Sequence, residues 1–151
     1  MPTEYRLRPV RKEDLPLFFA HQADPEGVRL AAFASRNEDA FNAHWARIMS
    51  DPAVTIRTIV DVCEAVVGNI VAFDMAGARE VGYWIDPNHW GRGAATSGLR
   101  KFLKIETQRP LHASVAAHNA GSIRVLEKCG FRRTSEYVGE TGTPMEVFVL
   151  P

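Results

Sequence analysis

Two glycines, Gly91 and Gly93, form the part of the sequence best suited to chemistry. Residues 80–85 before them have the alternating pattern of a strand, and the Asp, Pro and Asn at 86–88 end it, because proline cannot donate to a ladder. From Ala94 onward, apolar residues recur on one helical face. Glycines let a backbone approach a ligand closely, and the free N–H groups at a helix start favour an anion. The pattern therefore predicts a site for a phosphorylated ligand.

Two other interpretations of the glycine loop must be weighed. An isolated Gly-x-Gly is often only a tight turn. The loop could also belong to a dinucleotide-binding fold, but Thr96 replaces the third glycine of Gly-x-Gly-x-x-Gly. The loop also lies past the middle of the chain instead of in an opening βαβ unit. A second segment decides between these interpretations.

The second segment is a helix predicted over residues 119–129. Asn119 suits its N-cap, and Gly130 suits a left-handed cap at its end. Ile123 and Leu126 fall on one face, which is expected to be buried. Capping alone could explain both Asn119 and Gly130.

Taken together, the two segments resemble the GNAT superfamily of acetyl-coenzyme A dependent N-acyltransferases. Within it, the chain is most similar to the RimJ/RimL-like branch, whose members acetylate protein N-termini and small amines. Gly93 and Ala95 match the family's pyrophosphate motif, Gln/Arg-x-x-Gly-x-Gly/Ala, whereas Trp90 replaces the first residue of that motif. The resemblance covers residues 54–150 well and the first fifty residues weakly.

The resemblance implies acetyl-coenzyme A as cosubstrate and no metal. It implies that backbone N–H groups near Trp84 and Ile85 polarise the acetyl carbonyl, and that Asn119 lies near the pantetheine arm. The residues that it assigns to cosubstrate binding are Trp84, Ile85, Trp90, Gly91, Arg92, Gly93, Ala94, Ala95, Thr96, Asn119 and Ser122.

Acetyl transfer needs a neutral amine and a stabilised leaving thiolate. Glu80 matches a position where GNAT relatives carry a carboxylate that removes a proton, commonly through water; it could equally be an exposed charge at the strand end. Many GNAT enzymes carry a tyrosine that protonates the thiolate, and Leu126 stands at that position here. RimL-like relatives have a serine where Ser122 stands. Ser122 could therefore hydrogen-bond the thiolate, or it could be an ordinary first-turn helix residue.

The fold class expected from the resemblance and the pattern is α+β, the GNAT fold, with a mixed, mostly antiparallel sheet of about six or seven strands and about four helices. A break is expected at residues 24–27. The predicted strands cover residues 5–10, 54–61, 65–75, 80–85, 111–116, 131–138 and 145–150. The predicted helices cover residues 13–22, 39–49, 94–107 and 119–129.

The 151 residues, 46% hydrophobic and 24% charged, fit a single domain over residues 1–151. Eighteen basic and eighteen acidic residues give no net charge, which argues against nucleic acid or an anionic membrane as partner. Cys63 and Cys129 lack metal-ligand spacing and are expected to be buried thiols, and the histidines show no zinc motif. No leader or membrane span is apparent, so a cytoplasmic protein is expected.

The function expected is N-acetyl transfer to a primary amine, either a small molecule or a protein N-terminus, by direct attack in a ternary complex. The alternative is a non-catalytic module that binds or senses acyl-coenzyme A. The protein is expected to be a monomer or homodimer. Four residues could line an acceptor pocket, although core packing is the preferred interpretation: Phe33, Phe41, His44 and Trp45.

Overall fold

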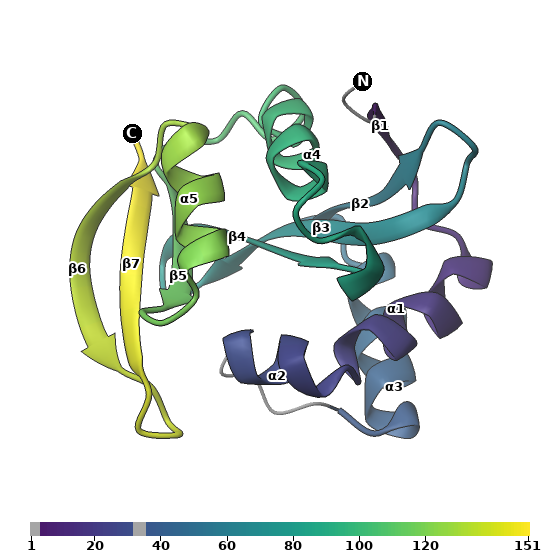
Figure 1. Ribbon diagram of the computed structural model, residues 1–151, viewed down its shortest axis with the longest axis horizontal. Coiled ribbons are helices and arrows are strands. Elements are labelled where there is room, and N and C mark those ends of the chain that lie inside the picture. Colours follow the sequence, from purple (N-terminus) through teal and green to yellow (C-terminus); the bar gives the residue numbers. More distant parts are fainter. Residues whose placement is uncertain (1–3, 32–35) are drawn as a thin grey trace.

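The computed structural model describes residues 4–31 and 36–151, and its centre is a seven-stranded sheet (Figure 1). The strand order is β1-β2-β3-β4-β5-β7-β6. All neighbours are antiparallel except β4 and β5, which are parallel. The strands are β1 (Tyr5–Arg8), β2 (Thr55–Asp61), β3 (Val66–Met75), β4 (Ala78–Ile85), β5 (Leu111–Ala116), β6 (Arg132–Val138) and β7 (Pro144–Leu150).

Helices cover both faces of this sheet. In Figure 1, α4 and α5 lie above it and α1, α2 and α3 lie below it. Their bounds are α1 (Leu15–Gln22), α2 (Pro25–Ala31), α3 (Glu38–Met49), α4 (Ala94–Phe102) and α5 (Ala120–Lys128), with short 3-10 turns at Lys12–Asp14 and Pro87–His89. The described part of the chain thus contains five α-helices where about four were expected.

The additional helix is α2, and the break predicted at residues 24–27 is shorter than expected, because only Ala23 and Asp24 separate α1 from α2. Pro25 occupies the first helical position, where its fixed φ suits the helix and its missing N–H costs nothing. Asp24 caps the same turn, because its Oδ2 accepts a hydrogen bond of 2.8 Å from the Gly27 N–H. The helix predicted over residues 94–107 is also shorter than expected, because α4 ends at Phe102.

Each face of the sheet has its own core. Leu99 and Phe102 of α4 and Leu126 of α5 pack against the upper face together with strand residues such as Phe148. Phe18, Phe41 and Trp45 form a smaller cluster on the lower face. Core packing of Phe41 and Trp45 is thereby confirmed, His44 is half-buried beside Trp45, and Phe33 lies outside the described residues.

The expectation for the cysteines is half wrong. Cys63 is exposed, because it lies in the turn between β2 and β3, whereas Cys129 is partly buried at the end of α5. Within residues 4–31 and 36–151, no cluster of His, Cys, Asp and Glu could hold a metal ion. No helix in those ranges is long and apolar enough to cross a membrane.

The sheet opens between its two parallel strands. β4 and β5 pair only at Arg79/Leu111 and Glu80/His112. β4 stays paired with β3 as far as Ile85, so beyond Glu80 it diverges from β5 while keeping its other neighbour. The opening faces α5 and the start of α4, which contain residues predicted to bind the cosubstrate.

Candidate active site

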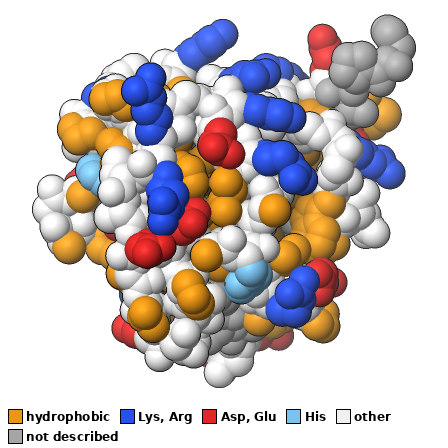
Figure 2. Space-filling model, turned by 60° about the vertical axis from the view of Figure 1, so that its left-hand side comes forward, with side chains coloured by type: hydrophobic (Ala, Val, Ile, Leu, Met, Phe, Trp, Pro, Cys, Tyr) orange, Lys and Arg blue, Asp and Glu red, His pale blue; other side chains and the backbone are white. Residues whose placement is uncertain are grey.

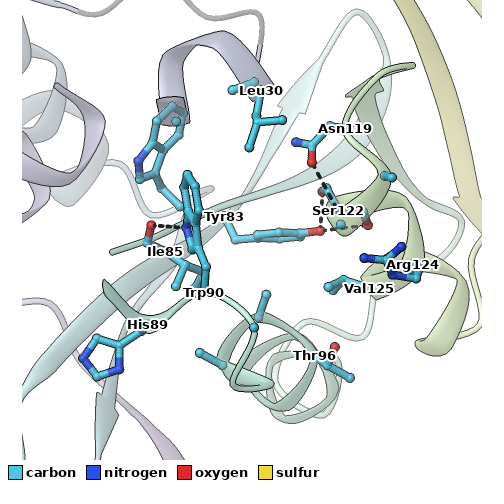
Figure 3. A pocket seen from close by; sticks show the side chains of 18 of the residues that line it. Leu30, Tyr83, Ile85, His89, Trp90, Thr96, Asn119, Ser122, Arg124 and Val125 are labelled. Carbon is cyan, nitrogen blue, oxygen red and sulfur yellow. Dashed lines mark hydrogen bonds between the residues drawn. The ribbon is translucent and has the colours of Figure 1, made fainter. Parts of the chain in front are cut away.

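A cavity of about 540 Å³ occupies this opening, between α2, β4, α4 and α5 (Figure 3). Ten of the predicted cosubstrate residues line it: Trp84, Ile85, Trp90, Gly91, Gly93, Ala94, Ala95, Thr96, Asn119 and Ser122. Arg92 lines a neighbouring depression. Glu80 lines neither of the two.

The glycine loop has the backbone of an anion cradle. Gly91 and Gly93 have φ of 74° and 82°, in the left-handed region that glycine adopts without strain. Gly93 is the N-cap of α4, and a Cβ built on either glycine meets no atom within 4 Å. Glycine is thus required for conformation, and the space beside it is open. The first N–H groups of α4 start here, beside the cavity.

A basic depression continues from the loop along α4. Among its described lining residues Glu4 is the one acidic residue, and five are cationic: Arg92, Arg100, Lys101, Lys104 and Lys128. Figure 2 shows Lys and Arg side chains gathered on the upper part of the molecule, where α4 and α5 lie. Although the chain has no net charge, this region favours an anion locally.

The open edge of β4 offers backbone donors to the cavity. The Asp86 N–H donates to the Val67 carbonyl at 2.8 Å, and ladder bonds alternate along an antiparallel strand. Trp84 therefore directs its backbone groups to β3, while Tyr83 and Ile85 direct theirs to the open side. The Trp90 indole N–H donates to the Ile85 carbonyl at 3.0 Å, which agrees with this direction. In the described part of the chain, the N–H groups that point to the open side thus belong to Tyr83 and Ile85, and Trp84 contributes its side chain.

Ser122 faces β4 from the first turn of α5. Asn119 caps this helix as predicted, because its Oδ1 accepts the Ser122 N–H at 3.2 Å. The Ser122 Oγ lies 2.6 Å from the phenol oxygen of Tyr83 (Figure 3). Burial raises the pKa of Tyr83 to about 12, partly offset by its hydrogen bond to Ser122. Leu126 is 1% exposed and packs in the upper core, so a tyrosine at this position would have to displace core residues before it reached the cavity.

Sequence reasoning missed Tyr83 as a site residue. Its apolar alternation with Val81 and Ile85 indicated only a strand. The one signal was the position itself, directly before the strand end that leads to the glycine loop.

Glu80 lies on the opposite face of the sheet from Tyr83, since strand residues alternate. It is half-buried at the last paired position before the strands diverge, and the Ser114 Oγ donates to its Oε1 at a long 3.4 Å. Among the described residues Glu80 takes part in no ion pair. Its carboxylate therefore lies without a cationic partner among the described residues, at the other mouth of the opening.

The α2 helix closes the lower side of the cavity. A Cβ on Gly27 would lie 3.2 Å from the Trp84 ring and 3.7 Å from the Trp90 ring, so glycine lets α2 approach both indoles. The Trp84 indole N–H donates to the His21 carbonyl at 2.9 Å. His118 of the loop after β5 contacts the Arg29 carbonyl at 2.8 Å. The rings of Trp84 and Trp90 and the α2 helix thus form the lower wall of the cavity.

Comparisons with known proteins agree with this architecture. The family model described as "Acetyltransferase (GNAT) domain" matches residues 5–132. The uncharacterized N-acetyltransferase p20 of Bacillus licheniformis is 24% identical over an alignment of 161 positions. The alignment covers 95% of this chain and 89% of that protein.

Solved structures show the same fold. A spermidine N-acetyltransferase from Vibrio cholerae, in complex with CoA and spermine, superposes with a TM-score of 0.84 at 16% identity, covering 97% of this chain and 94% of the other. A GNAT-family acetyltransferase from Bacillus anthracis superposes with a TM-score of 0.82 at 17% identity, covering 98% of this chain and 95% of the other. The expected mixed α+β fold is confirmed.

Proposed function

Because the chain belongs to the acetyltransferase (GNAT) domain family, whose enzymes depend on acetyl-coenzyme A, we propose that it transfers an acetyl group from this thioester to a primary amine by direct attack in a ternary complex. The observation that carries the proposal is the divergence of β4 from β5 directly beside the left-handed Gly93 N-cap of α4. This arrangement offers an extended edge for a chain-like ligand and an anion cradle at its end.

The residues present fit coenzyme A along its length. The N–H groups at the start of α4 would take the pyrophosphate, and the basic depression with Arg92 and Arg100 would take the remaining phosphate. The amide groups of the pantetheine arm would meet the open edge of β4, near Asn119. The Tyr83 and Ile85 N–H groups would polarise the acetyl carbonyl.

The chemistry assigned to the chain's own residues is proton removal and charge stabilisation. Glu80 removes the amine proton, through water, from the mouth opposite Tyr83. Ser122 donates a hydrogen bond to the departing thiolate. A free α-amino group has a pKa near 7.7–8.0, so it is partly neutral at pH 7 and needs less help than a lysine amine.

For the acceptor, we favour a small amine of low charge. No Asp or Glu is among the described residues that line the cavity, while the faces of Trp84 and Trp90 can attract one ammonium group. Spermidine N-acetyltransferases lie among the structural neighbours, but a polyamine would find no carboxylates in this lining. The α2 wall leaves less access for the N-terminus of a folded protein. The RimJ/RimL-like branch, a cytoplasmic location and a monomeric or homodimeric state stay predictions.

A second candidate function is an acyl-coenzyme A sensor without catalysis. It is favoured by Leu126, which cannot donate a proton and lies in the core. Thiol release from acetyl-coenzyme A, measured against a panel of monoamines, spermidine and a peptide N-terminus, separates the two. Amine-dependent release supports the transferase, and tight binding without release from any amine supports the sensor.

A further inference from the structure

Tyr83 and Ser122 form a short polar link across the opening. The two hydroxyl oxygens lie 2.6 Å apart, and Figure 3 shows the Tyr83 ring reaching from β4 toward the first turn of α5. Among the described cavity-lining residues, hydroxyl groups occur only at Tyr83, Thr96 and Ser122. Thr96 belongs to the phosphate end, so this pair supplies the hydroxyls near the open edge of β4.

The direction of the hydrogen bond follows from acidity. A phenol is a more acidic and therefore better donor than an aliphatic hydroxyl. The Tyr83 oxygen also lies 3.4 Å from the Ser122 carbonyl, which can only accept. The phenol has a single hydrogen, and the Ser122 Oγ at 2.6 Å is a nearer acceptor than this carbonyl, so we assign the phenol hydrogen to the Oγ. The Ser122 hydroxyl then keeps its own proton for another acceptor, and no other partner of its Oγ occurs among the described residues.

The pair is suited to donate hydrogen bonds and unsuited to give up a proton. Because burial raises the pKa of Tyr83 to about 12, its phenol is protonated near neutral pH. A thiol has a pKa near 8.5, so full transfer of the phenol proton to a thiolate would be strongly uphill. The amine nitrogen bonds to the acetyl carbon, and its proton passes through water to Glu80. The carbon–sulfur bond then breaks, its electron pair stays on sulfur as a thiolate that Ser122 stabilises, and solvent protonates that thiolate later.

We propose that Tyr83 is a positioning residue for the transfer step: its phenol donates to the Ser122 Oγ and so directs the Ser122 hydroxyl proton toward the leaving sulfur. The inference rests on the proposed acetyl transfer. It replaces the usual acid on α5 by a hydrogen-bonding pair split between β4 and α5. It also explains how a chain with Leu126 in the core can retain thiolate stabilisation.

The test is a double-mutant cycle with Tyr83→Phe and Ser122→Ala, followed by single-turnover thiol release. Each single substitution should slow the chemical step, Ser122→Ala by about ten- to hundredfold and Tyr83→Phe by less. Acetyl-coenzyme A affinity, measured by calorimetry, should stay unchanged. The double variant should match Ser122→Ala alone, because Tyr83 acts only through Ser122. The pH profile should keep its shape.

Tyr5→Phe is the matched control. Tyr5 is also buried in the upper core, but its hydroxyl has no partner among the described residues and lies on β1, outside the site. That variant should react at the wild-type rate. A purely structural role of Tyr83 would lower the thermal midpoint of Tyr83→Phe and leave its rate unchanged.

A second measurement needs no destabilising substitution. The chain contains three tyrosines, so all can be replaced by 3-fluorotyrosine, whose phenol is a stronger donor. The labelled wild type should react faster than the unlabelled protein, and labelled Ser122→Ala should show no gain. Full activity of Tyr83→Phe, or losses that multiply in the double variant, would overturn the inference while the proposed function stands. A wild type that releases no thiol with any amine would overturn both.

Discussion

Arg79 and Glu106 form a buried ion pair at the base of the opening, with 2.6 Å between Nη2 and Oε1 and a second bond of 3.0 Å from Nε. Their side chains are 7% and 6% exposed. Arg79 is the first β4 residue paired with β5, and Glu80 follows it on the other face. Arg79 therefore pairs with Glu106 on one face of the sheet, and the Glu80 carboxylate lies on the opposite face.

Replacing Glu106 by Gln should destabilise the fold by about 3 kcal/mol, because the buried guanidinium of Arg79 loses its buried counter-charge and keeps only the exposed Asp74 carboxylate. Asp74→Asn is the matched control. Asp74 also contacts Arg79, at 3.4 Å, but its side chain is 61% exposed, so its loss should cost less than about 1 kcal/mol. Urea unfolding measures the loss of unfolding free energy in each variant. Equal losses would show that the buried Glu106 contributes no more to stability than the exposed Asp74.

Substitution of Gly93 should weaken coenzyme A binding. Gly93→Ala places a Cβ in the open space beside the loop and strains a φ of 82°. We expect a loss of about tenfold or more in affinity by calorimetry, equivalent to about 1.4 kcal/mol. Gly142→Ala is the control, because Gly142 has a similar φ of 79° and equally open surroundings in the β6–β7 turn. If both variants bind like the wild type, the loop is not the phosphate site.

Glu80→Gln preserves size and removes the basic carboxylate. Turnover near pH 7 should fall by about a hundredfold or more while coenzyme A affinity is retained, as expected for a general base. Glu140→Gln, in the exposed β6–β7 turn, controls for the loss of one negative charge. If turnover of Glu80→Gln stays within about twofold of the wild type, Glu80 is a structural strand residue and the amine loses its proton elsewhere.

The stability of the fold should decrease as the pH falls below about 6.5, because of His21. Burial lowers the pKa of this histidine, although Asp86 at 3.7 Å opposes the shift. A group with a lowered folded pKa stabilises fully above its unfolded pKa, and the contribution is lost as the pH falls. His21→Gln should reduce the decrease in unfolding free energy between about pH 7.5 and 5.5.

His44 contributes to the same decrease, since burial also lowers its pKa. His44→Gln therefore provides the comparison, and its effect should be smaller because His44 is less buried than His21. The pKa values of Asp14 and Glu106 are lowered from values already near 4, so these groups titrate below this window. A pH dependence that is unchanged in His21→Gln would contradict the assignment.

Local signals in the sequence predicted most of the elements. The caps at Asn119 and Gly130 and the glycines at the start of α4 depend on near neighbours, and each occurs where it was expected. Pro25 was misinterpreted because the same residue can break a helix or begin one. Asp24 decides between the two, because its side chain accepts the Gly27 N–H and so caps a new helix.

Contacts between residues far apart in the chain could not be predicted from the sequence. Tyr83 and Ser122 are 39 residues apart, and Arg79 and Glu106 are 27 apart. Neither pair has a spacing signature, because their contacts depend on which strand lies beside which helix. The direction of the β4 N–H groups likewise depends on the register with β3.

The narrow contact between β4 and β5 has a mechanical consequence. Strands β1 to β4 and strands β5 to β7 share one ladder of two residue pairs, so the sheet consists of two halves joined by a short seam. A ligand whose amide groups bond to the free edge of β4 would serve as a substitute strand between the halves. Occupancy would then rigidify the whole sheet, and the backbone amides of Tyr83 and Ile85 would exchange their hydrogens more slowly.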